Sequence, residues 1–374
     1  MIEKQKIYAI GAVVVLLGVG IGAFILLSDD TIEGDFTVKD MRGRSVGIPA
    51  DVEKVVCISA GALRFVSYFD MDKVVGVDSY DKGSAGSMAN YNLAIYRAAF
   101  PDQLDDATDI GGISSFQEIM DTKADVIFTT TEAPATLDDL QTKTGIPVVG
   151  LRAEGYFDID QINTFYKQLE LIGKVLGMES RATELAAGIS GLLTELETYK
   201  LSVTTAQLKT SYICGLMTGM AGDFYKTTGK YIPFSSTCAL NVMPDISNMP
   251  YITDDIAILL ADPEYMFVDI ANYDSCMNTL KTNKTVLAGI DALEKGNVYT
   301  LLPYKYYNTN YESEIINCFA VGSILCSEVY DYDLEDKANE IIQLFFPKST
   351  LTYSEFTTLI GQEIGKIAPS AYGY

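Results

Sequence analysis

The sequence contains no histidine and no tryptophan among its 374 residues. Without histidine the chain cannot build Ser-His or Cys-His nucleophilic sites, nor the histidine-ligated sites that hold bare zinc or manganese. These absences exclude many enzyme classes, and we expect no catalytic site. Carboxylates, lysines, thiols and tyrosines are left for chemistry, and the 24 tyrosines make the aromatic contact surface phenolic.

Basic residues are scarce too. The chain has 27 lysines and arginines against 50 acidic residues, which gives a formal net charge of −23 and a pI near 4.3. Such a surface repels nucleic-acid phosphates, so we expect no nucleic-acid partner. The composition, 48% apolar and 21% charged, is typical of a globular protein. The length suits two lobes of ordinary size after a short N-terminal extension.

The six cysteines form no CxxC motif, and several lie in apolar runs, so we expect buried free thiols. Cys318 and Cys326 are eight residues apart in one predicted helix, which separates them by about 12 Å, too far for a disulfide. A pair between Cys238 and Cys276 stays open at this point.

Residues 1–33 are predicted to be a membrane anchor or signal segment followed by a linker. The stretch from Ile7 to Leu27 holds 21 residues without a charge, which is enough to span a bilayer as a helix. Lys4 and Lys6 precede it, and this orientation places the rest of the chain outside the cytoplasm. We favour an uncleaved anchor over a cleaved signal peptide, because the end of the run lacks a small-x-small cleavage site.

Short β-branched runs then alternate with helical patterns, which is typical of parallel sheets covered by helices. Strands are expected at 55–58, 74–77, 126–129 and 148–151, and again at 212–216, 265–269 and 298–302. Helices are expected at 62–69, 115–122, 135–143, 312–329 and 334–346. Between the two sets, 158–177 has apolar residues at helical spacing and ends at Gly177, which predicts a long bridging helix.

The expected organisation therefore has five segments. These are the anchor and linker over 1–33, an α/β lobe over 34–157, the bridging helix and the helix after it over 158–199, a second α/β lobe over 200–346, and a C-terminal tail or helix over 347–374. Residues 119–128 also align without gaps on residues 258–267, and in both stretches a helix ends at an acidic residue just before a strand. This pattern predicts one repeated helix-strand unit per lobe.

Several motifs, taken in order, resemble one protein family. They are Val38–Pro49, Ile110–Gly112, Lys123–Phe128, Thr144–Val149 and Leu171–Gly177, with Gly222–Lys230 and Tyr306–Asn310 in the second lobe. Together they resemble the ferric-siderophore and cobalamin class of ABC-transporter solute-binding proteins, the class III, periplasmic-binding-protein-like family, in its archaeal-type members. The resemblance implies two Rossmann-like lobes joined by one long rigid helix, with a ligand cleft between them.

The same resemblance implies a monomer without catalytic activity or a resident cofactor. It would capture an iron chelate or a corrinoid outside the cell and deliver it to a permease and an ATPase. Haem is least favoured as the ligand, because a chain without histidine would have to offer another axial ligand.

Ligands of open α/β sheets bind at the carboxyl ends of strands, so the loops there supply the candidate site. The candidates are Ser59, Arg64, Tyr80, Thr130, Glu132 and Arg152 in the first lobe, and Met217, Tyr225, Asn272, Tyr304 and Tyr307 in the second. The resemblance adds Tyr91 and Asn92. Aromatic faces would cover a macrocycle or catecholate, and Arg64 or Arg152 would meet an anionic chelate.

The family docks on its permease through one acidic residue per lobe. The matching positions here are Gln117 and Ile256, and the neighbouring Glu118 and Asp255 are the docking candidates. Two other functions stay open: a membrane-tethered ectodomain that senses the same ligand, and a non-catalytic, metal-cofactor-handling subunit of chelatase-like fold.

Overall fold

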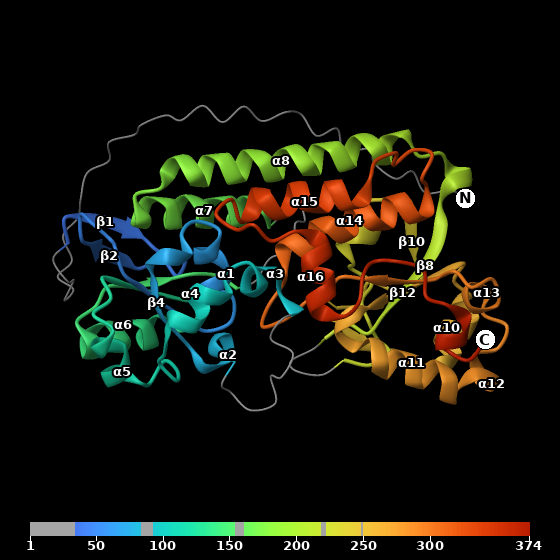
Figure 1. The fold of residues 1–374 in the computed structure, drawn as a ribbon, viewed down its shortest axis with the longest axis horizontal. Helices are drawn as coiled ribbons and strands as arrows, with labels where there is room; N and C mark the ends of the chain where they lie inside the picture. Colours follow the sequence, from blue (N-terminus) through green and yellow to red (C-terminus); the bar gives the residue numbers. More distant parts are fainter. Residues whose placement is uncertain (1–33, 84–92, 154–160, 218–221, 248–249) are drawn as a thin grey trace. The chain divides into compact units, whose positions relative to one another are not determined.

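A five-stranded parallel sheet forms the centre of the first lobe (Figure 1). The computed structural model describes residues 34–83, 93–153, 161–217, 222–247 and 250–374. The strands, in the spatial order β5-β4-β3-β6-β7, are β3 (Val55–Ile58), β4 (Val74–Val77), β5 (Thr108–Asp109), β6 (Val126–Thr129) and β7 (Val148–Gly150). The four strands predicted from the sequence are confirmed, with the last ending one residue early. Their β-branched side chains are buried on both faces.

A four-stranded parallel sheet forms the centre of the second lobe. Its strands, in the order β10-β8-β12-β13, are β8 (Lys209–Cys214), β10 (Ala239–Asn241), β12 (Tyr265–Asp269) and β13 (Val298–Leu301). The sequence predicted three of them. It missed β10, because a three-residue strand with two partly exposed positions carries no apolar run. The α/β fold with a parallel sheet in each lobe is confirmed.

Two pairs of antiparallel strands and a set of mostly short helices complete the lobes. One pair is the hairpin of β1 (Phe36–Lys39) and β2 (Ser45–Ile48), and the other joins β9 (Lys226–Thr227) to β11 (Tyr251–Ile252). The first-lobe helices are α1 (Ala62–Ser67), α2 (Ser79–Lys82), α3 (Ile95–Ala98), α4 (Pro101–Asp106), α5 (Phe116–Asp121) and α6 (Pro134–Thr144). The later helices are α9 (Ile232–Ser235), α10 (Asp255–Ala261), α11 (Tyr273–Thr282), α12 (Lys284–Leu287), α13 (Asp291–Glu294), α14 (Tyr311–Leu325), α15 (Leu334–Phe345) and α16 (Tyr353–Ile360).

The connection between the two sheets differs from the expected single bridge. The helix α7 (Ile162–Leu176) ends at Gly177, as predicted, and packs against β1 and α1 of the first lobe. The helix that continues to the second sheet is α8 (Glu179–Ser202), which has 24 residues and also packs on α14 and α15 (Figure 1). The predicted bridging role of 158–177 was therefore wrong. Its apolar stripe faces α8 and the first lobe, with Phe165 also packing on Tyr311 of α14. The helix predicted after it, up to residue 199, is present as α8 and is the longer of the two.

The repeated helix-strand unit is present in both lobes. Helix α5 precedes β6, and α10 precedes β12, with each helix and strand starting at positions that the alignment of 119–128 with 258–267 makes equivalent. In both sheets the strand lies between two parallel neighbours. Ile119 and Ile258 occupy matching positions and are both fully buried.

The C-terminal segment ties the two lobes together. Tyr68, which caps the end of α1, packs on Phe345 and Phe346, with ring centroids 4.9 and 5.5 Å apart. Farther on, the amide of Ile367 donates a 2.8 Å hydrogen bond to the Val298 carbonyl, so the chain end runs along the edge of β13. One apolar core cluster contains residues of both sheets. The lobes are therefore joined by shared packing as well as by the chain connections.

The six cysteines are buried and free, as predicted. Cys238 and Cys276, the pair that the sequence left open, belong to different core clusters. The thiol of Cys276 instead lies within hydrogen-bonding reach of Cys214, and that of Cys238 within reach of Cys326. Among the described residues no helix is both long and apolar enough to cross a bilayer, and the predicted membrane segment lies outside them.

Candidate functional site

Two predicted site tyrosines, one from each lobe, lie face to face. Tyr80 follows β4, and Tyr307 lies in the segment after β13, where its backbone adopts a left-handed conformation with a φ of 46°. The two rings are stacked, with centroids 5.1 Å apart and planes 27° apart. Tyr80 is 39% exposed, so this aromatic pair is open to solvent. Phenolic rings held in this way can stack on a flat ligand and can also form hydrogen bonds to it.

Asp78 fixes the position of this pair. Its Oδ2 accepts hydrogen bonds from the Tyr307 hydroxyl (2.9 Å) and the Ser59 amide (2.7 Å), and its Oδ1 accepts from the amides of Tyr80 and Asp81. Asp78 thus joins the ends of β3 and β4 to the second lobe. Asp78 is also the N-cap of α2, so its position in the sequence indicates a helix start and gives no sign of a role at the site.

The loops after β3 and β6 add a group of hydroxyls. Ser59 has a φ of 74°, which is unusual for a residue other than glycine, and its Oγ lies 3.2 Å from Oγ1 of Thr131. Oγ1 of Thr129 lies 3.1 Å from the same Thr131 oxygen. The sequence indicated Ser59 and Thr130, but the Thr130 hydroxyl donates to the Ala60 carbonyl, and Thr131 takes its place in the group.

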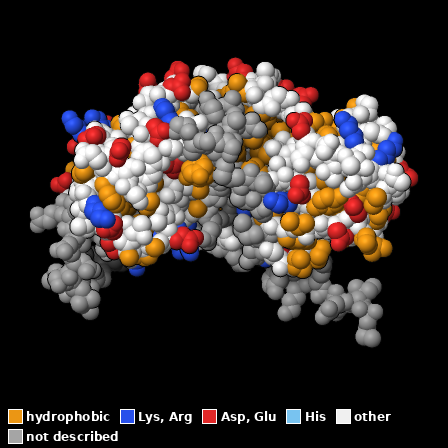
Figure 2. Space-filling view, turned by 90° about the horizontal axis from the view of Figure 1, so that it is seen from below, with side chains coloured by type: hydrophobic (Ala, Val, Ile, Leu, Met, Phe, Trp, Pro, Cys, Tyr) orange, Lys and Arg blue, Asp and Glu red, His pale blue; other side chains and the backbone are white. Residues whose placement is uncertain are grey.

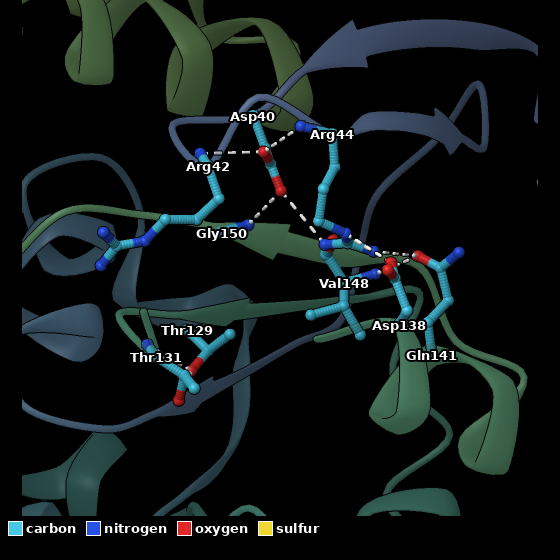
Figure 3. Close-up of polar contacts among 9 residues, drawn as sticks. All are labelled: Asp40, Arg42, Arg44, Thr129, Thr131, Asp138, Gln141, Val148 and Gly150. Carbon is cyan, nitrogen blue, oxygen red and sulfur yellow. Dashed lines mark hydrogen bonds and ion pairs between the residues drawn. The ribbon is translucent and has the colours of Figure 1, made fainter. Parts of the chain in front are cut away.

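A buried carboxylate positions an arginine beside these loops (Figure 3). The side chain of Asp40 accepts hydrogen bonds from the amides of Arg42, Arg44 and Gly150 at 2.8–3.1 Å. These three hydrogen bonds hold the turn between β1 and β2 against the end of β7. From that turn, Nη2 of Arg42 donates a 2.9 Å hydrogen bond to the Thr130 carbonyl. The family motif contained Arg42, but its position between two hairpin strands gave no reason to assign it to the site.

A pocket of about 570 Å³ opens between the lobes. Its lining includes Leu93 of the first lobe, Asn272 and Tyr273 after β12, and Leu359 and Gln362 at the end of α16. The predicted site residue Asn272 is therefore at the pocket, and its Nδ2 donates a 2.7 Å hydrogen bond to the carbonyl of Gly215, after β8. The contribution of α16 was not foreseen, because the sequence gave no reason to bring residues beyond 346 to the site.

Charge is buried behind the tyrosine pair. Burial, and after it the neighbouring Asp78 carboxylate, raises the pKa of Asp81 to about 7. Burial next to Asp78 and Asp81 also raises the pKa of the Tyr307 phenol. Nη1 of Arg97, on α3, donates a 3.0 Å hydrogen bond to the Tyr80 carbonyl. The positive charge of Arg97 partly opposes the rise in the pKa of Asp81. The phenol of Tyr307 is therefore neutral at physiological pH.

The structure buries Arg64 and Tyr304, both predicted ligand contacts, in contacts within the protein. The Arg64 side chain is fully buried and donates hydrogen bonds to the carbonyls of Thr309 (2.6 Å) and Tyr306 (2.9 Å). Tyr304 is 1% exposed, and its ring packs on Tyr231 with centroids 5.3 Å apart. Carboxyl-end loops also carry residues that join the lobes, and sequence position alone does not separate these from ligand contacts.

The other predicted residues are spread over the molecule. Glu132 and Arg152 are exposed after β6 and β7, and Met217 is half-buried after β8. Tyr225 donates a 2.8 Å hydrogen bond to Oδ1 of Asp255, within the second lobe. Tyr91 and Asn92 lie outside the described residues.

The two predicted docking residues occupy the first turns of equivalent helices, Glu118 on α5 and Asp255 on α10. In the part of the chain that the structure describes, no group of three or more Cys, Asp or Glu residues could hold a metal ion.

The fold matches that of solved solute-binding proteins. A periplasmic solute-binding protein from Veillonella parvula is 18% identical, with a TM-score of 0.68 over 87% of this chain and 97% of that one. The molybdate-bound periplasmic binding protein MolA from Haemophilus influenzae is 19% identical, with a TM-score of 0.63 over 85% and 100% of the two chains.

Nickel-bound CeuE from Helicobacter pylori is 14% identical, with a TM-score of 0.61 over 87% of this chain and 99% of that one. No protein-family model matches the sequence, and a search of curated proteins found no match. At these identities the comparisons establish the two-lobe class III fold.

Proposed function

We propose that this protein is the extracytoplasmic solute-binding component of an ABC importer, anchored by its N-terminal segment, and that it captures a metal chelate between its lobes. The class III fold supports the assignment, because the solved proteins that share it over more than four-fifths of the chain include ABC-transporter solute-binding proteins. The observation that carries the proposal is the stacked pair of Tyr80 and Tyr307, one from each lobe, at the carboxyl ends of their sheets.

The ligand class follows from the groups around this pair. Two phenolic rings, with the Ser59 and Thr131 hydroxyls linked to them through Asp78, supply aromatic faces with a few polar anchors. This combination suits a large organic complex such as a ferric siderophore or a corrinoid. A bare transition metal would prefer imidazole or thiolate ligands, and this chain has no histidine.

A binding screen of the full chain in detergent tests the proposal. Because the protein has no tryptophan, quenching of its tyrosine fluorescence reports on ligands directly, and calorimetry supplies an independent affinity. The panel contains ferric catecholates, ferric hydroxamates, cobalamin, molybdate and nickel chloride. We expect saturable one-to-one binding of a ferric complex or cobalamin.

The variants Tyr80→Ala and Tyr307→Ala should weaken that binding at least tenfold. Tyr374→Ala, which changes a tyrosine whose ring lies tilted against Tyr372 at the chain end, should leave it within twofold. Tight binding of molybdate or nickel alone, or equal affinities of the three variants, would contradict the proposal.

A further inference from the structure

Four of the six cysteines form two close pairs, both in the second lobe. Sγ of Cys276, in the first turn of α11, lies within hydrogen-bonding reach of Cys214, the last residue of β8. Sγ of Cys326, the C-cap of α14, lies within the same reach of Cys238, the residue before β10. The structure has all of them as free thiols, yet the members of each pair are placed to react with each other.

Other contacts of the chain hold the first pair together. A Cβ at position 215 would lie 3.0 Å from Sγ of Cys276, so this sulfur presses on the residue next to Cys214. Gly215 has a φ of 78°, a conformation that favours glycine. Nδ2 of Asn272 donates a 2.7 Å hydrogen bond to its carbonyl and so ties the start of α11 to the end of β8.

The second pair lies beside the start of β8. Sγ of Cys326 donates a 3.5 Å hydrogen bond to the Gln207 carbonyl, and the amide of Lys209 donates a 3.0 Å hydrogen bond to the Cys238 carbonyl. Helix α14 also packs on β10. Both thiols are therefore fixed against the same short segment of the chain.

We propose that the two pairs become disulfides, Cys214–Cys276 and Cys238–Cys326, when the chain folds in an oxidising compartment, while the other two cysteines stay free. In each bond one thiolate attacks a disulfide oxidant of the glutathione class, and the second thiolate then displaces the glutathione from the mixed disulfide. The two thiols lose two protons and two electrons, and one oxidised glutathione becomes two reduced ones. The extracytoplasmic location in the proposed function supplies the oxidising setting.

Oxidation has to come before burial. The four paired thiols are at most 1% exposed in the folded protein, so an oxidant or a reductant in solution does not reach them there. A chain that folds with a reductant keeps six thiols, and a chain that folds with a disulfide oxidant gains two crosslinks. The two folded forms interconvert only if the second lobe opens.

The crosslinks strengthen the lobe that has the smaller sheet. The bond between Cys214 and Cys276 joins β8 to α11 next to Asn272, which lines the pocket between the lobes, so it fixes this part of the pocket wall. Exposed apolar side chains also gather on this lobe, among them Ile256 and Leu260 (Figure 2). A partly open lobe adds to that apolar surface and aggregates, and crosslinks between distant segments oppose the opening.

Refolding of the full chain tests the proposal. The protein is unfolded in urea with dithiothreitol and refolded in detergent, either with dithiothreitol or in a mixture of reduced and oxidised glutathione. Counted in urea with Ellman's reagent after removal of the redox buffer, we expect six free thiols in the first product and two in the second. The second product should also unfold at a higher urea concentration. The reduced protein, given the glutathione mixture only after it has folded, should keep six thiols.

Peptide mapping without a reductant identifies the bonds, and we expect the two proposed pairs. After refolding with glutathione, Cys276→Ala should have three free thiols and keep the Cys238–Cys326 bond. Cys318→Ala, the matched change at a buried cysteine whose thiol lies near Ser236, should have one free thiol and keep both bonds. Six thiols in the wild-type product, a bond between Cys238 and Cys276, glutathione adducts or crosslinks between chains would each overturn the proposal. Failure of a variant to fold leaves the wild-type map to decide, and no ligand enters the measurement, so a failed importer assignment does not affect it.

Discussion

The guanidinium of Arg64 donates a 2.5 Å hydrogen bond to Oδ1 of Asn310, which joins α1 of the first lobe to the segment before α14. The same guanidinium bonds the Thr309 carbonyl, and its Nε lies 4.0 Å from Oε1 of Glu312. Both charged side chains are fully buried. Burial raises the pKa of Glu312, although the Arg64 charge opposes that rise. These contacts of Arg64 with Thr309, Asn310 and Glu312 join the lobes in the interior of the protein, and we call them the buried latch.

Removal of the Arg64 charge should destabilise the protein strongly. Arg64→Met leaves Glu312 buried without its partner and leaves three hydrogen-bond acceptors unsatisfied. We expect a loss of about 3–5 kcal/mol in the free energy of unfolding, measured by urea denaturation with circular dichroism. Arg152→Met, at an exposed arginine, should change it by less than about 0.5 kcal/mol. Equal effects of the two substitutions would show that the latch does not stabilise the fold.

The stability of the protein should fall as the pH rises toward neutrality. Asp81 has a pKa of about 7 in the folded protein, against an ordinary value of 3.8. The folded state therefore holds an extra proton between these values, and its stabilising effect is complete below pH 3.8 and lost as the pH rises through 7. The loss is at most about 4 kcal/mol. Asp269, whose pKa burial also raises to about 7, acts in the same direction.

Unfolding free energies at pH 5, 6, 7 and 8 check this prediction. Asp81→Asn should decrease by less than the wild type over that range, because the variant has no proton to lose there. Asp102→Asn, at an exposed position of α4, should follow the wild type. A wild-type stability that rises between pH 5 and 8 would contradict the prediction.

The six thiols should be inert in the folded protein. Each is buried, and burial raises the pKa of Cys57, Cys214 and Cys318 well above the ordinary value, so little reactive thiolate forms. Reaction with Ellman's reagent should be negligible over minutes in buffer and should reach six equivalents in urea. Four equivalents in urea would instead indicate one oxidised pair, and reaction before unfolding would show that a thiol is accessible.

The sheets could be predicted from the sequence because their strands carry a direct signal. The run at 55–58 is apolar throughout and that at 265–269 is apolar up to its last residue, Asp269, since both faces of each strand are covered, and the structure has strands with the same bounds. Strand β10 has only three residues and lies at a sheet edge, so no such run marks it. The bridging role was assigned to α7 because α7 has the stronger apolar stripe, although α8 covers the greater length.

The site was only partly predictable, because a loop position does not show where a side chain points. Tyr80 and Tyr307 were both among the predicted candidates, yet nothing in the sequence indicated that they stack. Arg64 has the same loop context and is buried in the latch. Arg42 reaches the site only because Asp40 anchors the hairpin turn on β7, a contact between residues 110 positions apart. Such long-range contacts leave no local pattern.

Two glycines in the paired helices α7 and α8 should respond to the same substitution in opposite ways. A Cβ on Gly173 would lie 2.7 Å from the Cβ of Ala182 on α8, which is closer than the helices allow. Gly173→Ala should therefore force α7 and α8 apart and cost about 1–3 kcal/mol of unfolding free energy. Gly191, in α8, has no atom within 4 Å of that position, so Gly191→Ala should stabilise the helix by up to about 1 kcal/mol.

Urea denaturation of the two variants under identical conditions separates the effects. The chemical change and the gain in helix propensity are the same, so the difference between the two free energies isolates the close packing of α7 on α8. If both variants are stabilised, the helices are not in contact at Gly173, and α8 is held to the first lobe by other residues. If Gly173→Ala is destabilised and Gly191→Ala is not, the close contact between Gly173 and Ala182 holds the start of α8 against α7, where the connection between the lobes begins.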